Sequence, residues 1–249
     1  MSQSELKQEE NLGSRGSRNL NRDIALSIIQ KILVPVIILL ILWHLIASLT
    51  RITLIDVYNA FVYLTFTGDS EGVYLIEHVI ASINRVALGF LLATITAVPL
   101  GIIIGRYRLA DSIFGPVVEA MRPIPPIAWI PLALLMFPGN VLGSQAFIIW
   151  IGAFFPILIN TTTGVKRTEP VHVDVAKTLG ANERQILGKI VLPSASPEIF
   201  AGLRVGFGIG WMCLVAAEML RGRIGLGYII WTYWSVGRTA EVITGMLLI

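Results

Sequence analysis

Long runs of uncharged, apolar residues alternate with short polar connections along most of this chain. A helix needs about 20 such residues to cross the hydrocarbon layer of a bilayer, and about 17 is the lower limit. Four runs reach that length, and each predicts a membrane-spanning helix. They cover residues 32–49, 86–104, 146–165 and 199–220.

Three further apolar segments are shorter or interrupted. Residues 124–142 contain four prolines, which remove helical hydrogen bonds and clash with the preceding turn, so a short and broken span is predicted there. Residues 224–236 are apolar and aromatic but too short to cross, which is typical of a re-entrant or interfacial piece. A last helix is expected from residue 241 onward, and because the chain stops inside it at Ile249, we expect the natural chain to continue.

The composition agrees with these segments. The chain is 55% hydrophobic and 14% charged, with a mean hydropathy of +0.75, whereas soluble domains are about 25% charged. An ordinary soluble fold is therefore excluded. The fold class predicted is an all-α integral membrane protein, a polytopic helical bundle of about six transmembrane helices in contact with lipid.

The polar chemistry excludes two classes of partner. The net charge of +3 comes from basic residues at segment ends, which form no patch, so no nucleic-acid partner is expected. Cys213 is the only cysteine, which rules out an intramolecular disulfide and a cysteine metal cluster. The three histidines lie in unrelated segments without the spacing of metal ligands: His44, His78 and His172. No metal or cofactor is expected on this chain.

Lysine and arginine in short loops favour the cytoplasmic side of a membrane. The N-terminal tail over residues 1–31 and the loops over 105–123 and 166–198 are basic, whereas the loop over 138–145 is uncharged. The tail and both basic loops are therefore predicted to lie in the cytoplasm. Four arginines fall on the opposite side: Arg51, Arg85, Arg221 and Arg223.

Small residues recur every fourth position in two of the predicted spans. Such a spacing places them in a stripe along one helix face, where the absence of bulk lets two backbones approach closely. In the span over 86–104 and the residue after it, the stripe is Gly89, Ala93, Ala97, Gly101 and Gly105. In the span over 199–220 it is Gly202, Gly206 and Gly210. They predict a compact bundle or a partner subunit. Because five spans and a partial sixth enclose little space, we expect a two-fold pair of chains in which these stripes find partners.

The longest polar connection, residues 166–198, has the pattern of two short helices. Gly180 can end the first helix, Asn182 can cap the second with Gln185 three residues on, and Pro193 is expected to stop it. Apolar residues recur at every fourth position of the first helix: Val171, Val175 and Leu179. A structured element of this kind on the cytoplasmic side is either a docking element or an interfacial loop packed on its own helices.

This loop resembles the EAA signature of ABC importer permeases, in which E-A-A, three residues, G, nine residues and I-x-L-P follow one another. The matching residues are Asp174, Val175, Ala176, Gly180, Ile190, Leu192 and Pro193, with Asp for Glu and Val for Ala at the first two positions. Further segments are similar to the nitrate, sulfonate, taurine and bicarbonate branch of these permeases: Ser82 with Arg85 and Gly89, the runs over 122–132 and 154–161, Gly202-Leu203-Arg204, and Ala217-Glu218.

The resemblance covers residues 78–249 and implies a permease core of the type I ABC importer kind. It implies a second permease copy, two cytoplasmic ABC ATPase subunits that bind ATP and Mg, and an extracytoplasmic solute-binding protein. The implied solute is a small oxyanion. The residues that would couple to the ATPase are Asp174, Val175, Ala176, Leu179, Gly180, Ala181 and Arg184. The sequence has no phosphate-binding loop, because Gly188-Lys189 is followed by Ile190, so this chain is not expected to hydrolyse ATP itself.

Polar groups at membrane depth are the candidates for a solute path or gate, because they are costly in hydrocarbon and face a cavity or one another. They are Asn160, Thr161, Arg204 and Glu218. For Glu218 a structural ion pair with Arg221 or Arg223 is the other interpretation. A secondary transporter or channel stays open as an alternative function, although a proton relay would have only His44, Glu119 and Glu218 to use.

Overall fold

The structure is a computed structural model and describes residues 29–31, 33–38, 41, 43–45 and 52–249. Two compact units are distinguished, Met1–Asp56 and Val57–Ile249. Residues 1–28 of the predicted tail lie outside the described part. The described residues of the span predicted over 32–49 are helical.

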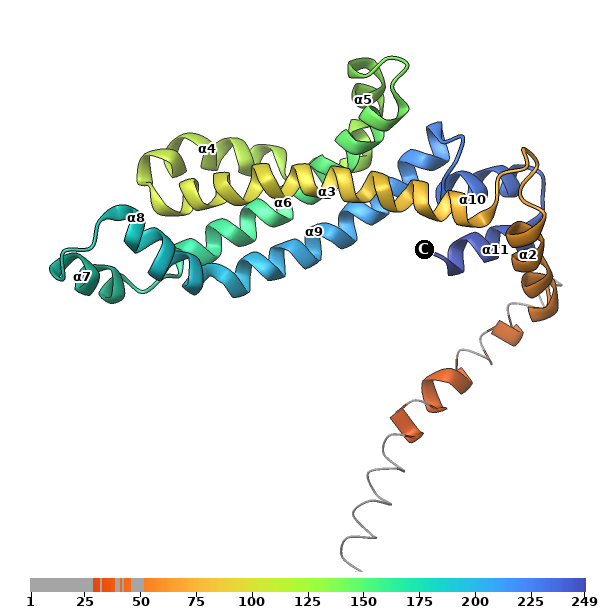
Figure 1. Ribbon diagram of the computed structural model, residues 1–249, viewed down its shortest axis with the longest axis horizontal. Coiled ribbons are helices and arrows are strands. Elements are labelled where there is room, and N and C mark those ends of the chain that lie inside the picture. The colour runs from red at the N-terminus through yellow and green to blue at the C-terminus, as the bar shows by residue number, and fades with distance from the viewer. Residues whose placement is uncertain (1–28, 32, 39–40, 42, 46–51) are drawn as a thin grey trace, which may run out of the picture. The chain divides into compact units, whose positions relative to one another are not determined.

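Three long helices form the frame of the second unit: α3 (Leu75–Arg106), α6 (Val141–Lys166) and α9 (Leu192–Arg221). They lie side by side in Figure 1. At a rise of 1.5 Å per residue, their 32, 26 and 30 residues extend for about 48, 39 and 45 Å. Each therefore exceeds the hydrocarbon layer, which is about 30 Å thick. The spans predicted over 86–104, 146–165 and 199–220 lie within them.

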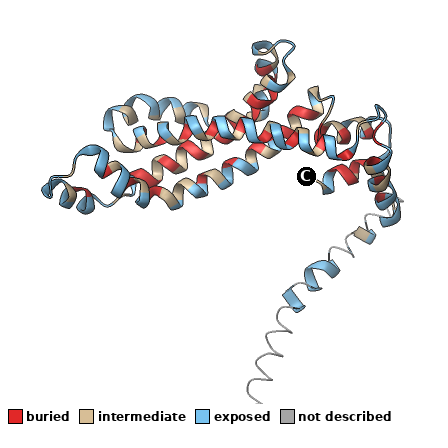
Figure 2. Cartoon of the chain, viewed as in Figure 1, coloured by how far each residue is buried: buried red, intermediate tan, exposed pale blue. Residues whose placement is uncertain are grey.

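Helix α6 is the central helix of this frame, and its buried positions stand out in Figure 2. On one side it meets the small-residue stripe of α3. A Cβ on Gly89 would lie 2.6 Å from the Cβ of Ile149, and a Cβ on Gly101 would lie 2.8 Å from the Cβ of Thr161. Such distances leave no room for a side chain, so these glycines set the close approach of the two backbones.

The stripe of α9 packs on another side of α6. A Cβ on Gly202 would lie 2.7 Å from the Cβ of Asn160, and one on Gly206 would lie 2.8 Å from Cγ1 of Ile157. The two stripes thus find their partner in α6 of the same chain. The expectation that a second copy would fill them is corrected, because α6 already occupies both faces.

The proline-rich segment between α4 (Arg108–Met121) and α6 forms two short pieces instead of a crossing helix. These are the 3₁₀ turn η1 (Pro126–Trp129) and helix α5 (Ile130–Met136). Together they contain 11 residues, which is about half of what a span needs. The prolines explain this, since Pro126 and Pro131 each occupy a helix start, where the missing N–H costs nothing, and Pro138 follows the end of α5.

One end of the frame carries the polar loop of residues 166–198. It contains helix α7 (Pro170–Thr178), helix α8 (Glu183–Ile186) and the π-helical segment η2 (Leu187–Val191), which runs directly into α9. The prediction that Pro193 stops the second helix is wrong. Pro193 lies in the first turn of α9. It has no N–H to donate, and the π-helical segment before it accommodates the hydrogen bond that the helix lacks there.

The other end of the frame carries three shorter helices, α2 (Leu54–Phe66), α10 (Leu226–Ser235) and α11 (Thr239–Leu247). A small apolar cluster joins them to the start of α3, with Leu64, Leu75, Ile229, Tyr233 and Val242 at its centre. The interfacial piece predicted over 224–236 contains α10, and the helix expected from residue 241 onward lies within α11.

Candidate functional site

Helix α7 presents an apolar face to the outside of the molecule. Val171 is 65% exposed, Val175 is 52% exposed and Leu179 is 83% exposed. These are the residues that recur every fourth position in the sequence, so their stripe faces away from the protein. Beside it lies a groove of about 510 Å³, lined on its far side by Lys189 and Ile190. An apolar surface of this kind on a polar loop is typical of a site where another protein binds.

The turn after α7 is fixed by its backbone. Gly180 has φ +80°, and its N–H donates to the carbonyl of Lys177, while the N–H of Ala181 donates to the carbonyl of Ala176. This pair of bonds is the Schellman motif, which favours glycine at the left-handed position. Asn182 and Gln185 then form the predicted capping box at the start of α8.

Both helices of the loop are fastened to the long helices. The inner face of α7 contributes Val173 to an apolar cluster with Ile186, Val191, Ala195 and Val165. At the edge, the guanidinium of Arg106 at the end of α3 lies 2.9 Å from the carboxylate of Glu183. We name α7, α8 and η2, with the turn between them, the knob. Because the knob is packed on α6 and continuous with α9, a force on it reaches two long helices.

Of the predicted coupling residues, those on the outer surface of the knob are Asp174, Val175, Leu179, Gly180 and Arg184. Ala176 and Ala181 are half-buried against the apolar cluster beneath.

At the opposite end of the frame, the carboxylate of Glu218 is fully buried. Ser82 donates to both of its oxygens at 2.9 and 3.0 Å, Arg85 donates at 2.6 Å, and the backbone N–H of Gly227 donates at 3.0 Å. The same guanidinium also donates to the carbonyl of Ile224 at 2.5 Å. The interpretation of Glu218 as a structural ion pair with an arginine is therefore supported, but the arginine is Arg85 of α3 and not Arg221 or Arg223.

Two more residues extend this network. His78 is fully buried, and its Nδ1 accepts from the backbone N–H of Gly225 at 2.9 Å. Its Nε2 lies 3.3 Å from Asp69, although not in hydrogen-bond geometry. Gly225 leaves space for the carboxylate, because a Cβ there would clash with Glu218. We name Asp69, His78, Ser82, Arg85 and Glu218 the outer network; it ties the start of α3 to the turn between α9 and α10.

The sequence singled out Glu218, and the family resemblance included Ser82 and Arg85, but nothing in the sequence paired these two residues with Glu218. Ser82 and Arg85 lie 136 and 133 residues away in the chain, and a hydropathy pattern carries no information on such pairs. The available signal was spacing, because His78, Ser82 and Arg85 recur at intervals that place them on one face of a helix.

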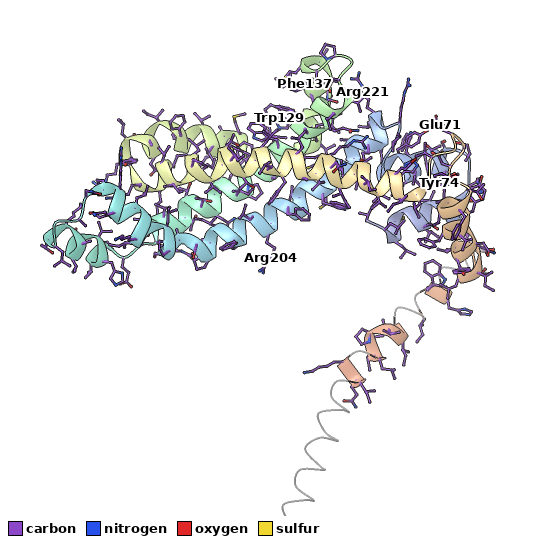
Figure 3. All side chains as sticks on the ribbon, in the orientation of Figure 1. Glu71, Tyr74, Trp129, Phe137, Arg204 and Arg221 are labelled. Atoms are coloured by element: carbon purple, nitrogen blue, oxygen red, sulfur yellow. The ribbon has the colours of Figure 1, made fainter. Side chains whose placement is uncertain are left out.

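The remaining polar candidates occupy separate places. Thr161 is buried against α3, and its hydroxyl has no hydrogen-bond partner among the described residues. Asn160 donates to the carbonyl of Pro156 one turn earlier, and its Cβ packs against Gly202. Arg204 is exposed on α9 and points away from the three long helices in Figure 3. The four path candidates are thus not brought together into one site within a single chain.

The sequence matches the family described as the binding-protein-dependent transport system inner membrane component over residues 97–248. This chain belongs to that family. The matched range includes the knob and most of the three-helix frame, which agrees with the resemblance found in the loop.

Curated relatives share this core. A protein of Methanocaldococcus jannaschii named as an ABC transporter permease is 53% identical over 70% of this chain and 66% of its own length. The nitrate import permease NrtB of Leptolyngbya laminosa is 36% identical over 73% of this chain and 64% of its own length. Bicarbonate and taurine transport permeases match at 37% and 35% identity. The chain therefore spans slightly less than two thirds of the length of these relatives.

A solved structure shows the same fold. A chain of the MetNI methionine ABC transporter, in an inward-facing conformation, matches with a TM-score of 0.57. The match covers 70% of this chain and 87% of that one, at 18% identity. The chain is a helical membrane protein with the fold of an ABC importer permease.

Proposed function

We propose that this chain is the permease subunit of an ATP-driven importer for a small oxyanion in the cytoplasmic membrane. The solute class follows relatives that are named as permeases for nitrate import and for bicarbonate and taurine transport. Two copies would enclose the solute path, two ATPase subunits would bind ATP and Mg, and a solute-binding protein would deliver the solute from outside. The N-terminal tail would lie in the cytoplasm by the charge rule.

The observation that carries this proposal is the knob. Its outer face is apolar and its inner face is packed on α6 and continuous with α9. This combination suits an ATPase docking site, since an exposed apolar stripe gives binding energy and a rigid attachment transmits movement. A flexible linker would provide neither the binding energy nor the transmission of movement.

The alternative of a proton-coupled carrier has less support. A relay needs a titratable group that can exchange its proton inside the membrane. The carboxylate of Glu218 is instead held by Ser82, Arg85 and a backbone N–H, which suits a fixed structural charge.

The test of the proposal uses Gly180→Val. A β-branched residue at φ +80° is strained by about 1–3 kcal/mol, so the turn between α7 and α8 should change direction. We expect the ATPase subunits to stop co-purifying with the permease, and stimulation of their ATP hydrolysis by loaded binding protein to be lost. Insertion in the membrane should be unchanged, because no spanning helix is touched.

The matched control is Gly139→Val. Gly139 has φ +78°, and a Cβ at either glycine meets no atom within 4 Å, so both substitutions impose the same backbone strain. Gly139 lies in the turn before α6, in the uncharged loop, away from the knob. We expect this variant to retain the ATPase. Normal co-purification in Gly180→Val, or equal loss in both variants, contradicts the docking role of the knob.

A further inference from the structure

Arg204 is the only charged residue of α9 between Glu198 and Glu218. Those two residues are 20 positions apart, which is about 30 Å along a helix and equals the thickness of the hydrocarbon layer. Arg204 lies about 9 Å inside this interval, measured from Glu198. A guanidinium at this depth is costly unless it faces water or an anionic partner.

The packing of α9 fixes the direction of Arg204. Successive residues of a helix are rotated by about 100°, so Gly202 and Gly206 each lie about 160° around the helix from Arg204. Both glycines are pressed against α6. The contact that seats α9 in the frame therefore points Arg204 away from α6, as Figure 3 shows.

No carboxylate in the described part of the chain lies within ion-pair distance of Arg204. Four positions lie one turn away from Arg204, and two of them are small while the other two are the exposed Phe200 and Phe207. Ala201, one turn before, is exposed, and Gly208, one turn after, is exposed and would meet no atom within 4 Å if it carried a Cβ. Unlike Gly202 and Gly206, Gly208 serves no packing contact within this chain. The face thus combines a cation that has no ion pair among the described residues with a narrow strip of small residues, Ala201 and Gly208, beside two exposed phenylalanines.

We propose that Arg204 lines the solute path inside the membrane and supplies the positive charge that selects oxyanions. This inference rests on the proposed transport function and names the residue that recognises the solute class. A guanidinium is suited to this role, because its fork of N–H donors matches the planar oxygens of nitrate, carboxylate or sulfonate groups and it stays protonated. Ala201 and Gly208 leave room for the anion to pass beside it.

The test uses thiol labelling of the permease in membranes. Cys213 is the only native cysteine and is buried, so Cys213→Ala gives a background without cysteine. Ala201→Cys is then introduced beside Arg204. Its reaction rates are measured with an anionic and a cationic methanethiosulfonate reagent, neither of which enters lipid. We expect the anionic reagent to react faster, and the ratio of the two rates to fall about tenfold or more in Arg204→Gln but to persist in Arg204→Lys.

Ile95→Cys is the control for depth. Ile95 is 60% exposed on α3 and lies 11 residues before Arg106, and Ala201 lies 9 residues after Leu192 at the same end of the frame, so the two positions have a similar depth. We expect Ile95→Cys to be unreactive. If Ala201→Cys is unreactive as well, the face is sealed and the inference is wrong. If the ratio of rates does not change in Arg204→Gln, the charge of Arg204 does not set selection, and the inference is equally wrong.

The labelling rates are measured on the permease without its ATPase, so the result does not depend on the outcome of the docking experiment. Loss of the ATPase partnership would end the proposed function while leaving the labelling pattern intact. Sealing of the Arg204 face would end this inference while leaving the ATPase bound. The two failures are therefore distinguishable.

Discussion

Helix α9 carries two charged residues at membrane depth whose surroundings are opposite, because one is buried in an ion pair and the other is exposed. Glu218 is fully buried, and each of its carboxylate oxygens accepts from at least two donors. Arg204, 14 positions earlier, is exposed and has no ion pair in the described part of the chain. A charge that is fully paired inside one chain stabilises the fold, whereas a charge without a partner in the chain needs water or an oppositely charged group outside the chain. The contrast separates a charge that is paired within the chain from one that has no partner among the described residues.

The strongest way to break this comparison is Glu218→Gln. The substitution leaves Arg85, whose side chain is only 14% exposed, without its counter-ion. Removing one partner of a buried pair costs about 3–5 kcal/mol. We expect a clear loss of thermal stability in detergent and of permease in the membrane. The double variant Arg85→Gln with Glu218→Gln should recover part of the loss, because no lone charge remains buried; unchanged melting in the single variant would show that the outer network is not structural.

A second test compares two glycines of the same helix, Gly206→Leu and Gly208→Leu. Gly206 is pressed against Ile157, so a larger side chain must push α9 from α6 at a cost of about 1–3 kcal/mol or more. Gly208 has open space. We expect only Gly206→Leu to lower the melting temperature of the permease. Gly208→Leu should reduce solute uptake instead, since it narrows the face of Arg204, and equal destabilisation by both would contradict the assignment of the two faces.

The smallest stability effect is expected for Arg204→Leu. Because no partner within the described residues is lost, the free energy of unfolding should change by about 0.5 kcal/mol or less. The measurement is a thermal melt beside Glu218→Gln under the same conditions. A loss as large as that of Glu218→Gln would show that Arg204 is paired within the chain.

The sequence by itself determined much of this protein. Apolar length predicted the three long helices, and the helix-ending glycine and the capping residues predicted the turn at Gly180 and the capping box at Asn182. These features are local, because a helix makes its backbone bonds within itself and a turn depends on a few neighbouring residues. The family followed from the same local motifs.

Only the tertiary structure decided which distant groups meet. In the structure α3 begins at Leu75, although the polar residues near its start placed the predicted span later in the sequence. These polar residues can lie in the helix because His78, Ser82 and Arg85 form hydrogen bonds with residues more than 130 positions later. It also assigned the partner of the glycine stripes, which the sequence could describe but not place, to α6. The spacing of small residues predicts that another backbone approaches closely, but which backbone does so depends on how the helices pack. The same packing places Arg204 on the outside of the helix bundle.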